Sequence, residues 1–273
     1  YSTIRFFCQV FPFFLGKYPT FGVAGRGMAC YNRKKGGADM EQLRELLGVG
    51  RGVTAVMGSG GKTSLLYQLA EELRPCGTVL LATTTHIMRP PQYPFAGTAE
   101  ELAAALAAHG AACIGSYTPE GKLTAPAFAG WQQAADFVLV EVDGSKRLPA
   151  KAHETWEPVL PPERTRTVCV LGASAFGQPI RQAAHRPAIY ARLAGAPWSA
   201  SITPEMAGAP WSASITPEMA ARVICAEGLC DIIYVNQVDD AELSPPWAET
   251  FAKASNVPVV IGSLQARRWR RLT

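Results

Sequence analysis

The sequence predicts an α/β fold in which a mostly parallel sheet lies between two layers of helices. Three observations support this prediction. Short apolar runs rich in β-branched residues recur along the chain, as buried strands do. Segments with apolar residues at helical spacing follow several of these runs. Polar residues gather where the runs end, and parallel sheets bind ligands at that edge. The expected strands are residues 53–57, 78–82, 111–115, 136–143, 167–171, 231–235 and 257–261.

The first of these runs opens the most informative stretch, residues 53–73, which reads VTAVMGSGGKTSLLYQLAEEL. A glycine loop follows the run, and Lys62, Thr63 and a helical pattern of leucines follow the loop. This order is the P-loop arrangement, in which backbone N–H groups and a helix N-terminus hold phosphates, the lysine adds a charge and the threonine can bind magnesium. The sequence therefore predicts a P-loop NTPase-like, three-layer fold. The expected phosphate-binding residues are Gly58, Ser59, Gly60, Gly61, Lys62, Thr63 and Ser64.

The glycine loop is shorter than the common P-loop pattern. That pattern has a glycine five positions before Gly61, where this chain has Val56. The form G-S-G-G-K-T resembles the ATP-binding loop of Mur-type amide ligases. An ATP-dependent ligase is therefore an alternative function, and a glycine-rich turn that binds nothing is a further interpretation.

The apolar run of residues 136–144 ends in acidic residues. Glu141 and Asp143 are two positions apart, so their side chains leave the same face of a strand. Glu141 lies within apolar residues, where an unpaired charge is costly, so a functional role or a buried partner is expected. We expect Thr63 and Asp143 to hold Mg²⁺ and Glu141 to orient the attacking group. The predicted catalytic residues are thus Lys62, Glu141 and Asp143.

Polar side chains follow both the strand at 78–82 and the acidic strand. We expect the strand at 78–82 to lie directly beside the first strand, so that these side chains adjoin the phosphates. They could form a substrate or switch loop, although ordinary strand residues and a polar surface loop would have the same composition. The candidate substrate residues are Thr84, Thr85, His86, Ser145, Lys146, Arg147, Lys151, Glu154, His185 and Arg186.

Residues 236–239 read N-Q-V-D after another expected strand. GTPases have N-K-x-D at this place, where the aspartate pairs with guanine. We expect Asn236 and Asp239 to contact the nucleotide. Gln237 replaces the lysine, so both ATP and GTP stay open, as does a simple polar turn.

The chain of 273 residues could form one large α/β domain or two small ones, and its 48% apolar content suffices for a core. Residues 1–39 differ from the rest. We expect them to be a poorly ordered N-terminal extension before a nucleotide-binding domain at residues 40–273, which begins with a helix over residues 40–48. The apolar run Phe6–Gly16 is far shorter than the roughly 20 residues that span a bilayer, so no membrane partner is expected.

Charge and cysteine usage exclude few functions. The net charge is +4, and the basic tail Arg267–Arg271 is expected to be a solvated terminus rather than a nucleic-acid contact. Seven cysteines occur without a C-x-x-C pair, which favours reduced thiols and a cytoplasmic location. Cys225 and Cys230 could bind selenium or a metal, but buried thiols are the more common case.

A 13-residue segment is repeated letter for letter, because Gly195–Ala207 and Gly208–Ala220 both read GAPWSASITPEMA. Two copies are too few for a repeat fold. In the second copy Thr216 caps a helix that can continue to Gly228, whereas in the first copy a glycine and a proline stop the helix after one turn. We expect the second copy to hold the native helix and the first to be a surface insertion.

Together the motifs resemble one family. The blocks G-S-G-G-K-T, L-A-T-T-T-H, E-V-D-G-S-K-R-L-P-A-K, H-R-P, T-P-E-M-A and V-N-Q-V-D occur in this order, as in the YqeC-type accessory proteins of selenium-dependent molybdenum hydroxylases. The third block is the most specific, since generic P-loop proteins lack it. The resemblance covers residues 40–273 and excludes the first 39 residues and the duplication.

The resemblance implies a role in the maturation of selenium-dependent molybdenum hydroxylases, such as xanthine dehydrogenase, or of their cofactor. It also implies partners among these hydroxylases and among selenium- or molybdopterin-handling proteins. The first hypothesis is therefore a magnesium-dependent NTPase that serves this maturation. The alternatives are the Mur-like ligase and a carrier or chaperone whose affinity for its cargo is set by a bound nucleotide.

Overall fold

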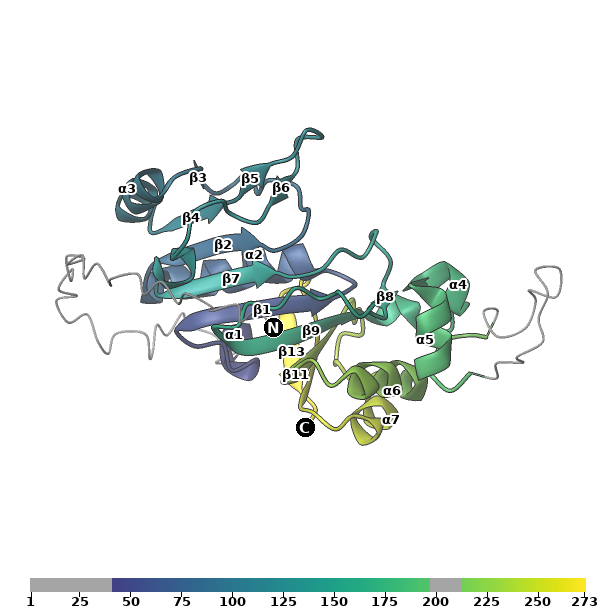
Figure 1. Cartoon of the computed structure of the whole chain (residues 1–273). Coiled ribbons are helices and arrows are strands. Elements are labelled where there is room, and N and C mark those ends of the chain that lie inside the picture. Colours follow the sequence, from purple (N-terminus) through teal and green to yellow (C-terminus); the bar gives the residue numbers. More distant parts are fainter. Residues whose placement is uncertain (1–40, 197–212) are drawn as a thin grey trace, which may run out of the picture. The chain divides into compact units, whose positions relative to one another are not determined.

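The structure, a computed structural model, describes residues 41–196 and 213–273 (Figure 1). The helices in this part of the chain are α1 Leu43–Leu46, α2 Lys62–Leu73, α3 Ala99–His109, α4 Ile180–Ala183, α5 Pro187–Leu193, α6 Pro217–Glu227 and α7 Ala248–Ala254. The strands are β1 Gly52–Gly58, β2 Val79–Thr83, β3 Phe95–Ala96, β4 Ala111–Ile114, β5 Ser116–Tyr117, β6 Leu123–Thr124, β7 Phe137–Glu141, β8 Ala150–Lys151, β9 Arg164–Gly172, β10 Ala184–His185, β11 Ile232–Asn236, β12 Val259–Ser263 and β13 Arg268–Arg271.

Nine of the described strands form one sheet in the order β13-β12-β11-β9-β1-β7-β2-β4-β3. The neighbouring pairs are parallel, except that β12 and β13 are antiparallel. The prediction of an α/β fold with a mostly parallel sheet is therefore confirmed. The expected strands correspond to β1, β2, β4, β7, β9, β11 and β12.

One predicted pair of neighbours is wrong, because β2 does not lie beside β1. β7 lies between them and places Glu141 opposite Val56 of β1 and opposite Thr83 of β2. Strand order depends on the packing of the whole sheet and not on the order of strands along the chain. The acidic end of β7, and not the end of β2, is therefore next to the glycine loop.

Two apolar cores lie on the two faces of the sheet. One core packs side chains of α1 and α2, such as Leu65, on strand residues such as Val56. The other packs side chains of α3 to α7, such as Phe251, on strand residues such as Ala55. Neighbouring residues of β1 thus enter opposite cores, which explains why the strand is apolar throughout. The described residues form three layers, with helices on both faces of the sheet (Figure 1).

Threonine side chains cap two of the described helices. Thr98 Oγ1 accepts a hydrogen bond from the N–H of Glu101 at the start of α3. Thr216 Oγ1 accepts one from the N–H of Met219 at the start of α6, so the second copy of the repeat holds the expected helix. Most of the first copy lies outside the described residues, as do residues 1–39.

The helix expected over residues 40–48 is much shorter. Only α1 is helical, because the Glu72 carboxylate accepts hydrogen bonds from the N–H groups of Leu43 and Arg44 and thereby fixes where the helix begins. Gly48 follows the helix with a φ of +64°, which ends it.

The basic tail has more regular structure than expected. Arg268–Arg271 form the edge strand β13, in which Arg270 and Arg271 are exposed. Trp269 Nε1 donates to the carbonyl of Glu41 at 2.7 Å, and Arg270 Nε donates to that of Leu243 at 2.5 Å. These long side chains cover neighbouring loops, which the charge of the segment does not reveal.

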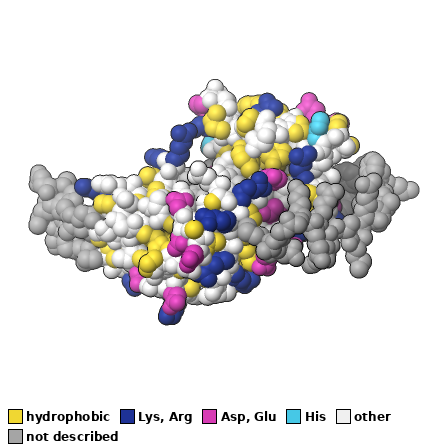
Figure 2. Space-filling model, turned by 180° about the vertical axis from the view of Figure 1, so that it is seen from behind, with side chains coloured by type: hydrophobic (Ala, Val, Ile, Leu, Met, Phe, Trp, Pro, Cys, Tyr) yellow, Lys and Arg dark blue, Asp and Glu magenta, His cyan; other side chains and the backbone are white. Residues whose placement is uncertain are grey.

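Figure 2 shows basic and acidic side chains interspersed on one face of the molecule. Among the described helices, none is long and apolar enough to cross a membrane.

Candidate functional site

The candidate site lies where β1, β7 and β9 end, at the carboxyl edge of the sheet. The glycine loop turns here from β1 into α2, whose first residue is Lys62. Packing alone requires glycine at position 60, because a Cβ there would lie 2.3 Å from the backbone nitrogen of Gly172 and φ is +87°. The glycine content of the loop is thus explained by its contact with β9 and does not by itself indicate a ligand.

The backbone N–H groups of residues 60–64 are a stronger signal. No acceptor in the described part of the chain takes a hydrogen bond from them, and Gly61 precedes α2 without a side-chain cap. Free N–H groups at a helix N-terminus attract anions, since the helix dipole adds a partial positive charge. Ser59, the residue before them, is bound within the protein. Its buried hydroxyl donates to the carbonyl of Leu148 and so ties the loop to the segment after β7.

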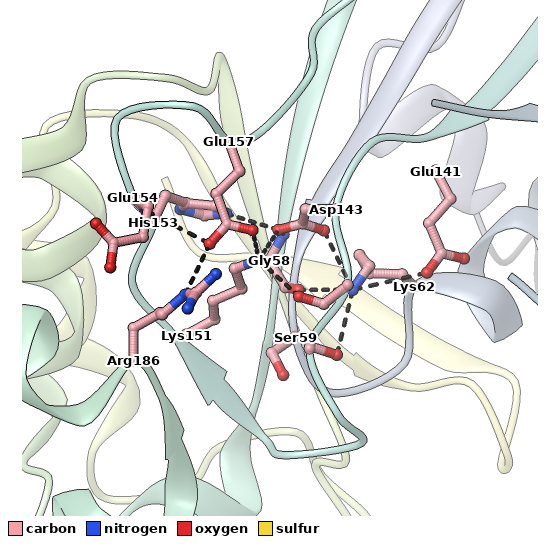
Figure 3. A network of polar contacts seen from close by, with 12 residues as sticks. Gly58, Ser59, Lys62, Glu141, Asp143, Lys151, His153, Glu154, Glu157 and Arg186 are labelled. Carbon is pink, nitrogen blue, oxygen red and sulfur yellow. Dashed lines mark hydrogen bonds and ion pairs between the residues drawn. The ribbon is translucent and has the colours of Figure 1, made fainter. Parts of the chain in front are cut away.

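The side chain of Lys62 is buried against two carboxylates (Figure 3). Its Nζ lies 3.2 Å from Asp143 Oδ1 and 3.7 Å from Glu141 Oε1. It also donates to the carbonyl of Gly58 at 2.8 Å and to Ser145 Oγ at 3.3 Å. A buried ammonium group needs such partners. The structure therefore brings together the predicted lysine, both predicted carboxylates and one predicted substrate residue.

Asp143 is surrounded by positive charge. Its carboxylate lies 3.3 Å from Lys151 Nζ and 2.6 Å from His153 Nε2, and it accepts the N–H of Gly58 at 3.0 Å. Burial by itself would raise the pKa of Asp143, but the hydrogen bond with His153 and the charges of Lys62 and Lys151 lower it to about 2. Asp143 therefore stays ionised and orients both lysines.

His153 connects Asp143 to α6. Its Nδ1 lies 2.8 Å from Glu227 Oε2, and its backbone N–H donates to Glu227 Oε1 at 2.7 Å. Burial disfavours the charged imidazole, but the hydrogen bonds to the two carboxylates outweigh burial and raise the pKa of His153. Glu227 is not among the residues that the sequence predicted for the site. His153 and Glu227 are 74 positions apart, and no local pattern marks the pair.

Thr63 and Glu141 form a second polar pair beside the loop. Thr63 Oγ1 donates to Glu141 Oε2 at 2.9 Å. Burial raises the pKa of Glu141, while the charge of Lys62 and the Thr63 hydrogen bond oppose the rise. Hydroxyl and carboxylate oxygens are ligands that Mg²⁺ accepts. No group of three or more His, Cys, Asp or Glu side chains among the described residues could hold a metal ion, so Mg²⁺ here would need phosphate and water oxygens as well.

A further polar cluster adjoins Asp143 (Figure 3). Lys151 Nζ donates to the carbonyl of Gly144 at 2.6 Å and to Glu157 Oε2 at 2.9 Å. Glu157 Oε1 accepts from Arg186 Nε at 3.1 Å. Burial acts to raise the pKa of Glu157, but its hydrogen bond with Lys151 and the Lys151 charge lower it. Lys151 and Arg186 are among the candidate substrate residues predicted from the sequence.

Four other predicted substrate residues lie beside this cluster. Lys146 and Arg147 follow Ser145 and are exposed. The N–H of Glu154 donates to Glu157 Oε1 at 3.4 Å. His185 pairs with Lys151 between β10 and β8.

Thr84, Thr85 and His86 are placed differently. They follow β2, which β7 separates from the glycine loop. Thr84 Oγ1 donates to the carbonyl of Val159 at 2.7 Å, and the N–H of Thr85 donates to Thr83 Oγ1 at 3.0 Å. These contacts join the end of β2 to neighbouring segments and not to Lys62.

A cavity of about 900 Å³ lies on another side of the loop, between α2 and the ends of β9, β11 and β12. Ser64, Asn236, Asp239 and Trp247 are among its lining residues. The Asn236 amide donates to the carbonyl of Gly60 at 2.9 Å and accepts the N–H of Leu264 at 3.1 Å. Asn236 therefore supports the glycine loop, whereas Asp239 is exposed at the cavity.

Cys225 and Cys230 are half-buried and belong to no disulfide. Cys225 Sγ accepts the N–H of Asn256 at 3.3 Å, which is a local packing contact.

Fold and site together define a class of α/β protein that presents a glycine loop, a buried lysine and two carboxylates at the carboxyl edge of a parallel sheet. Residues 54–188 match the family model described as YqeC protein, and this stretch contains the loop, both carboxylates and Arg186. This match and the relative described below place residues 54–188 in the YqeC family, as the motifs predicted.

One relative in that family is the "Uncharacterized protein YqeC" of Escherichia coli (strain K12). It is 33% identical to this chain over an alignment of 155 residues, and the alignment covers 52% of this chain and 60% of the relative. The chain thus matches less than two thirds of the relative's length. No solved structure matches the chain.

Proposed function

We propose that the chain binds a magnesium nucleoside triphosphate at the glycine loop and hydrolyses it. The free N–H groups of residues 60–64 carry this proposal, because they offer an anion site beside the buried charge of Lys62. The loop would hold the phosphates, and Lys62 would contact the β and γ phosphates. Hydrolysis would depend mainly on positioning and on neutralising charge. This is a P-loop NTPase-like activity.

Thr63 and Glu141 would hold the Mg²⁺ ion, which neutralises phosphate charge when bound. From the sequence we expected Asp143 in this role and Glu141 beside the attacking group. The contacts support exchanging the two roles. Asp143 already faces Lys62, Lys151 and His153, and a dication at that place would be repelled.

The cavity beside α2 would take the base and ribose. Ser64 lies both at the N-terminus of α2 and in the cavity wall, so the two subsites are continuous. Asp239 is one of three exposed carboxylates there, with Glu71 and Asp240, and it could accept hydrogen bonds from a base. Gln237 occupies the position of the lysine in a GTPase motif but contacts the neighbouring loop, because its Oε1 accepts a hydrogen bond from Ser174 Oγ at 2.7 Å. Both ATP and GTP fit this description.

The family resemblance supports a cytoplasmic role in the maturation of selenium-dependent molybdenum hydroxylases or their cofactor. Partners would then be such a hydroxylase or a selenium- or molybdopterin-handling protein. A second candidate is an ATP-dependent ligase. It is favoured by the cationic cluster next to Asp143, which would attract a carboxylate substrate.

The test is binding and turnover of ATP and of GTP by the full chain with Mg²⁺. Lys62→Ala should abolish both binding and turnover. Lys122→Ala, a change at an exposed position, should alter neither. Tight binding with negligible turnover would show that the chain is not a hydrolase and would favour the carrier whose affinity for its cargo is set by a bound nucleotide. Absence of binding to either nucleotide would overturn the proposal.

A further inference from the structure

Cationic side chains gather beyond Asp143 in a small area of the carboxyl edge. Lys146 and Arg147 directly follow Ser145, which contacts Lys62 at 3.3 Å. Arg186 reaches the same area from β10 through a chain of contacts, because Arg186 binds Glu157, Glu157 binds Lys151, and Lys151 donates to the carbonyl of Gly144. These contacts are 3.1, 2.9 and 2.6 Å long, and Figure 3 shows the first two.

The area has more positive than negative charge. Its cationic residues are Lys146, Arg147, Lys151 and Arg186, whereas its acidic residues are Glu154 and Glu157. Lys151 is buried and satisfied by its partners. Arg186 differs, because its side chain is 33% exposed and only its Nε binds a carboxylate in the described part of the chain. The two terminal nitrogens of Arg186 therefore remain available to an anion.

The backbone is also unusual here. Lys146, Arg147 and Arg186 have φ angles of 50°, 62° and 64°. Side chains other than glycine rarely adopt such angles, and residues that do so cluster at ligand sites, where the strain positions a side chain. Three of the six described non-glycine residues with positive φ belong to this one area. A surface loop without a ligand gives no reason for this coincidence.

An exposed aromatic ring borders the cationic residues. Trp156 is 67% exposed, and the guanidinium carbon of Arg186 lies 6.0 Å from the centre of its ring. Large exposed aromatic side chains are costly in water and are common where a flat ligand binds. The area thus combines a stacking surface with hydrogen-bond donors that carry positive charge.

We propose that Lys146, Arg147, Trp156 and Arg186 form a second ligand site for a molecule that carries an anionic group on a flat, apolar ring system. The anionic group, a phosphate or a carboxylate, would face the guanidinium and ammonium groups, and the ring would lie against Trp156. The role of this ligand as the second substrate of the reaction at the glycine loop rests on the proposed function. The binding of the ligand does not depend on that function.

The test uses two fluorescent probes that differ by one charge. 1-Anilinonaphthalene-8-sulfonate has an aromatic ring system with an anionic group, and N-phenyl-1-naphthylamine is the same molecule without the sulfonate. The full chain should bind the sulfonate about tenfold more tightly, as one charge-assisted hydrogen bond would produce. Added salt should reduce this difference, because part of the site is exposed.

Two variants separate the ring from the charge. Trp156→Leu should weaken the binding of both probes, whereas the double variant Lys146→Gln with Arg147→Gln should weaken the binding of the sulfonate only. Both changes are at exposed positions, so the fold should be retained. The matched controls are Tyr117→Leu, which is 52% exposed, and Arg192→Gln, which is exposed on α5. Neither control should change the binding of either probe.

Equal binding of the two probes, or unchanged binding in the variants, would overturn the proposal. Displacement of the sulfonate by inorganic phosphate but not by acetate would identify a phosphoryl group, and the reverse would identify a carboxylate. The same measurement with Lys62→Ala keeps the two proposals separate. If this variant loses nucleotide but still binds the sulfonate, the second site stands independently of the first.

Discussion

Lys62 and Asp143 form a buried ion pair, in which Nζ lies 3.2 Å from Oδ1 and the two side chains are 3% and 0% exposed. The pair joins the first residue of α2 to the segment after β7. The glycine loop and the acidic strand are thereby held in one arrangement. Asp143 also contacts Lys151 and His153, so one carboxylate compensates several buried positive charges.

Asp143→Asn should therefore destabilise the protein by about 3 kcal/mol, because removal of one partner leaves buried charges unpaired. Urea unfolding at pH 7 would measure the change. The exposed Asp239→Asn is the matched control and should stay within about 0.5 kcal/mol of the unchanged protein. Equal stabilities of the two variants would show that Asp143 does not compensate these charges.

The sequence predicted what local patterns encode. The strand, glycine loop and helix around Lys62 follow from apolar spacing, and the start of α6 follows from Thr216. The position of β7 between β1 and β2 did not follow, because each of these strands is apolar on both faces and can be placed in several orders.

The parts of the site that the sequence missed depend on distant contacts. Glu227 contacts His153 only because α6 packs over the same face of the sheet. β13 was missed for a different reason, since its R-W-R-R sequence lacks the alternation of apolar and polar residues that marks a half-buried strand. Its arginines and tryptophan are used to cover neighbouring loops.

Gly60→Ala tests whether the loop must approach β9. The new Cβ would lie 2.3 Å from the backbone nitrogen of Gly172 at a φ of +87°, so a loss of about 2–3 kcal/mol is expected. Gly110→Ala is the control, because its φ is +69° but nothing lies within 4 Å of the added atom. It should cost only about 1 kcal/mol, from backbone strain. Similar losses in thermal unfolding for both variants would mean that the contact with Gly172 can relax.

Asn236 and Asp239 should have separable effects on nucleotide binding. Asn236→Ala removes the hydrogen bonds to Gly60 and Leu264, so the loop loses support. The affinities for ATP and for GTP should therefore fall by similar factors. Asp239→Asn leaves the loop supported and should alter only the preference between the two bases. Titration of both nucleotides against both variants measures this. A base-specific effect of Asn236→Ala would place its amide on the base instead.

Deletion of residues 195–207 should leave the fold intact. The two copies of the repeat are identical, so the shortened chain still contains the residues that form α6, including the Thr216 cap. The thermal midpoint should change by less than about 4 °C, which corresponds to roughly 1 kcal/mol for a domain of this size. A change of Thr216 to Ala in the full chain is the contrast, since loss of the cap should cost about 1 kcal/mol. An unfolded deletion variant would show that both copies are structural.

Glu157→Gln should reveal a pH-dependent part of stability. The carboxylate binds Lys151 and Arg186, and its pKa is lowered in the folded protein. A lowered pKa means that the folded state favours the ionised form, so the contribution is present at neutral pH and is lost as pH falls from about 4.5 through the lower folded value. At pH 7 the variant should be less stable by about 1–2 kcal/mol, since hydrogen bonds between charged groups are replaced by weaker ones and the site is partly exposed.

Urea unfolding of the protein and of Glu157→Gln from pH 7 to pH 3 would measure this contribution. The two stability curves should converge at the acidic end, because Glu157 is then protonated in both the folded and the unfolded state. The exposed Glu249→Gln, whose partner is Lys253 on the same helix, is the control and should differ by less than about 0.5 kcal/mol at every pH. A difference between the protein and Glu157→Gln that is constant, or that grows toward low pH, would mean that the carboxylate is held by packing rather than by the charges of Lys151 and Arg186.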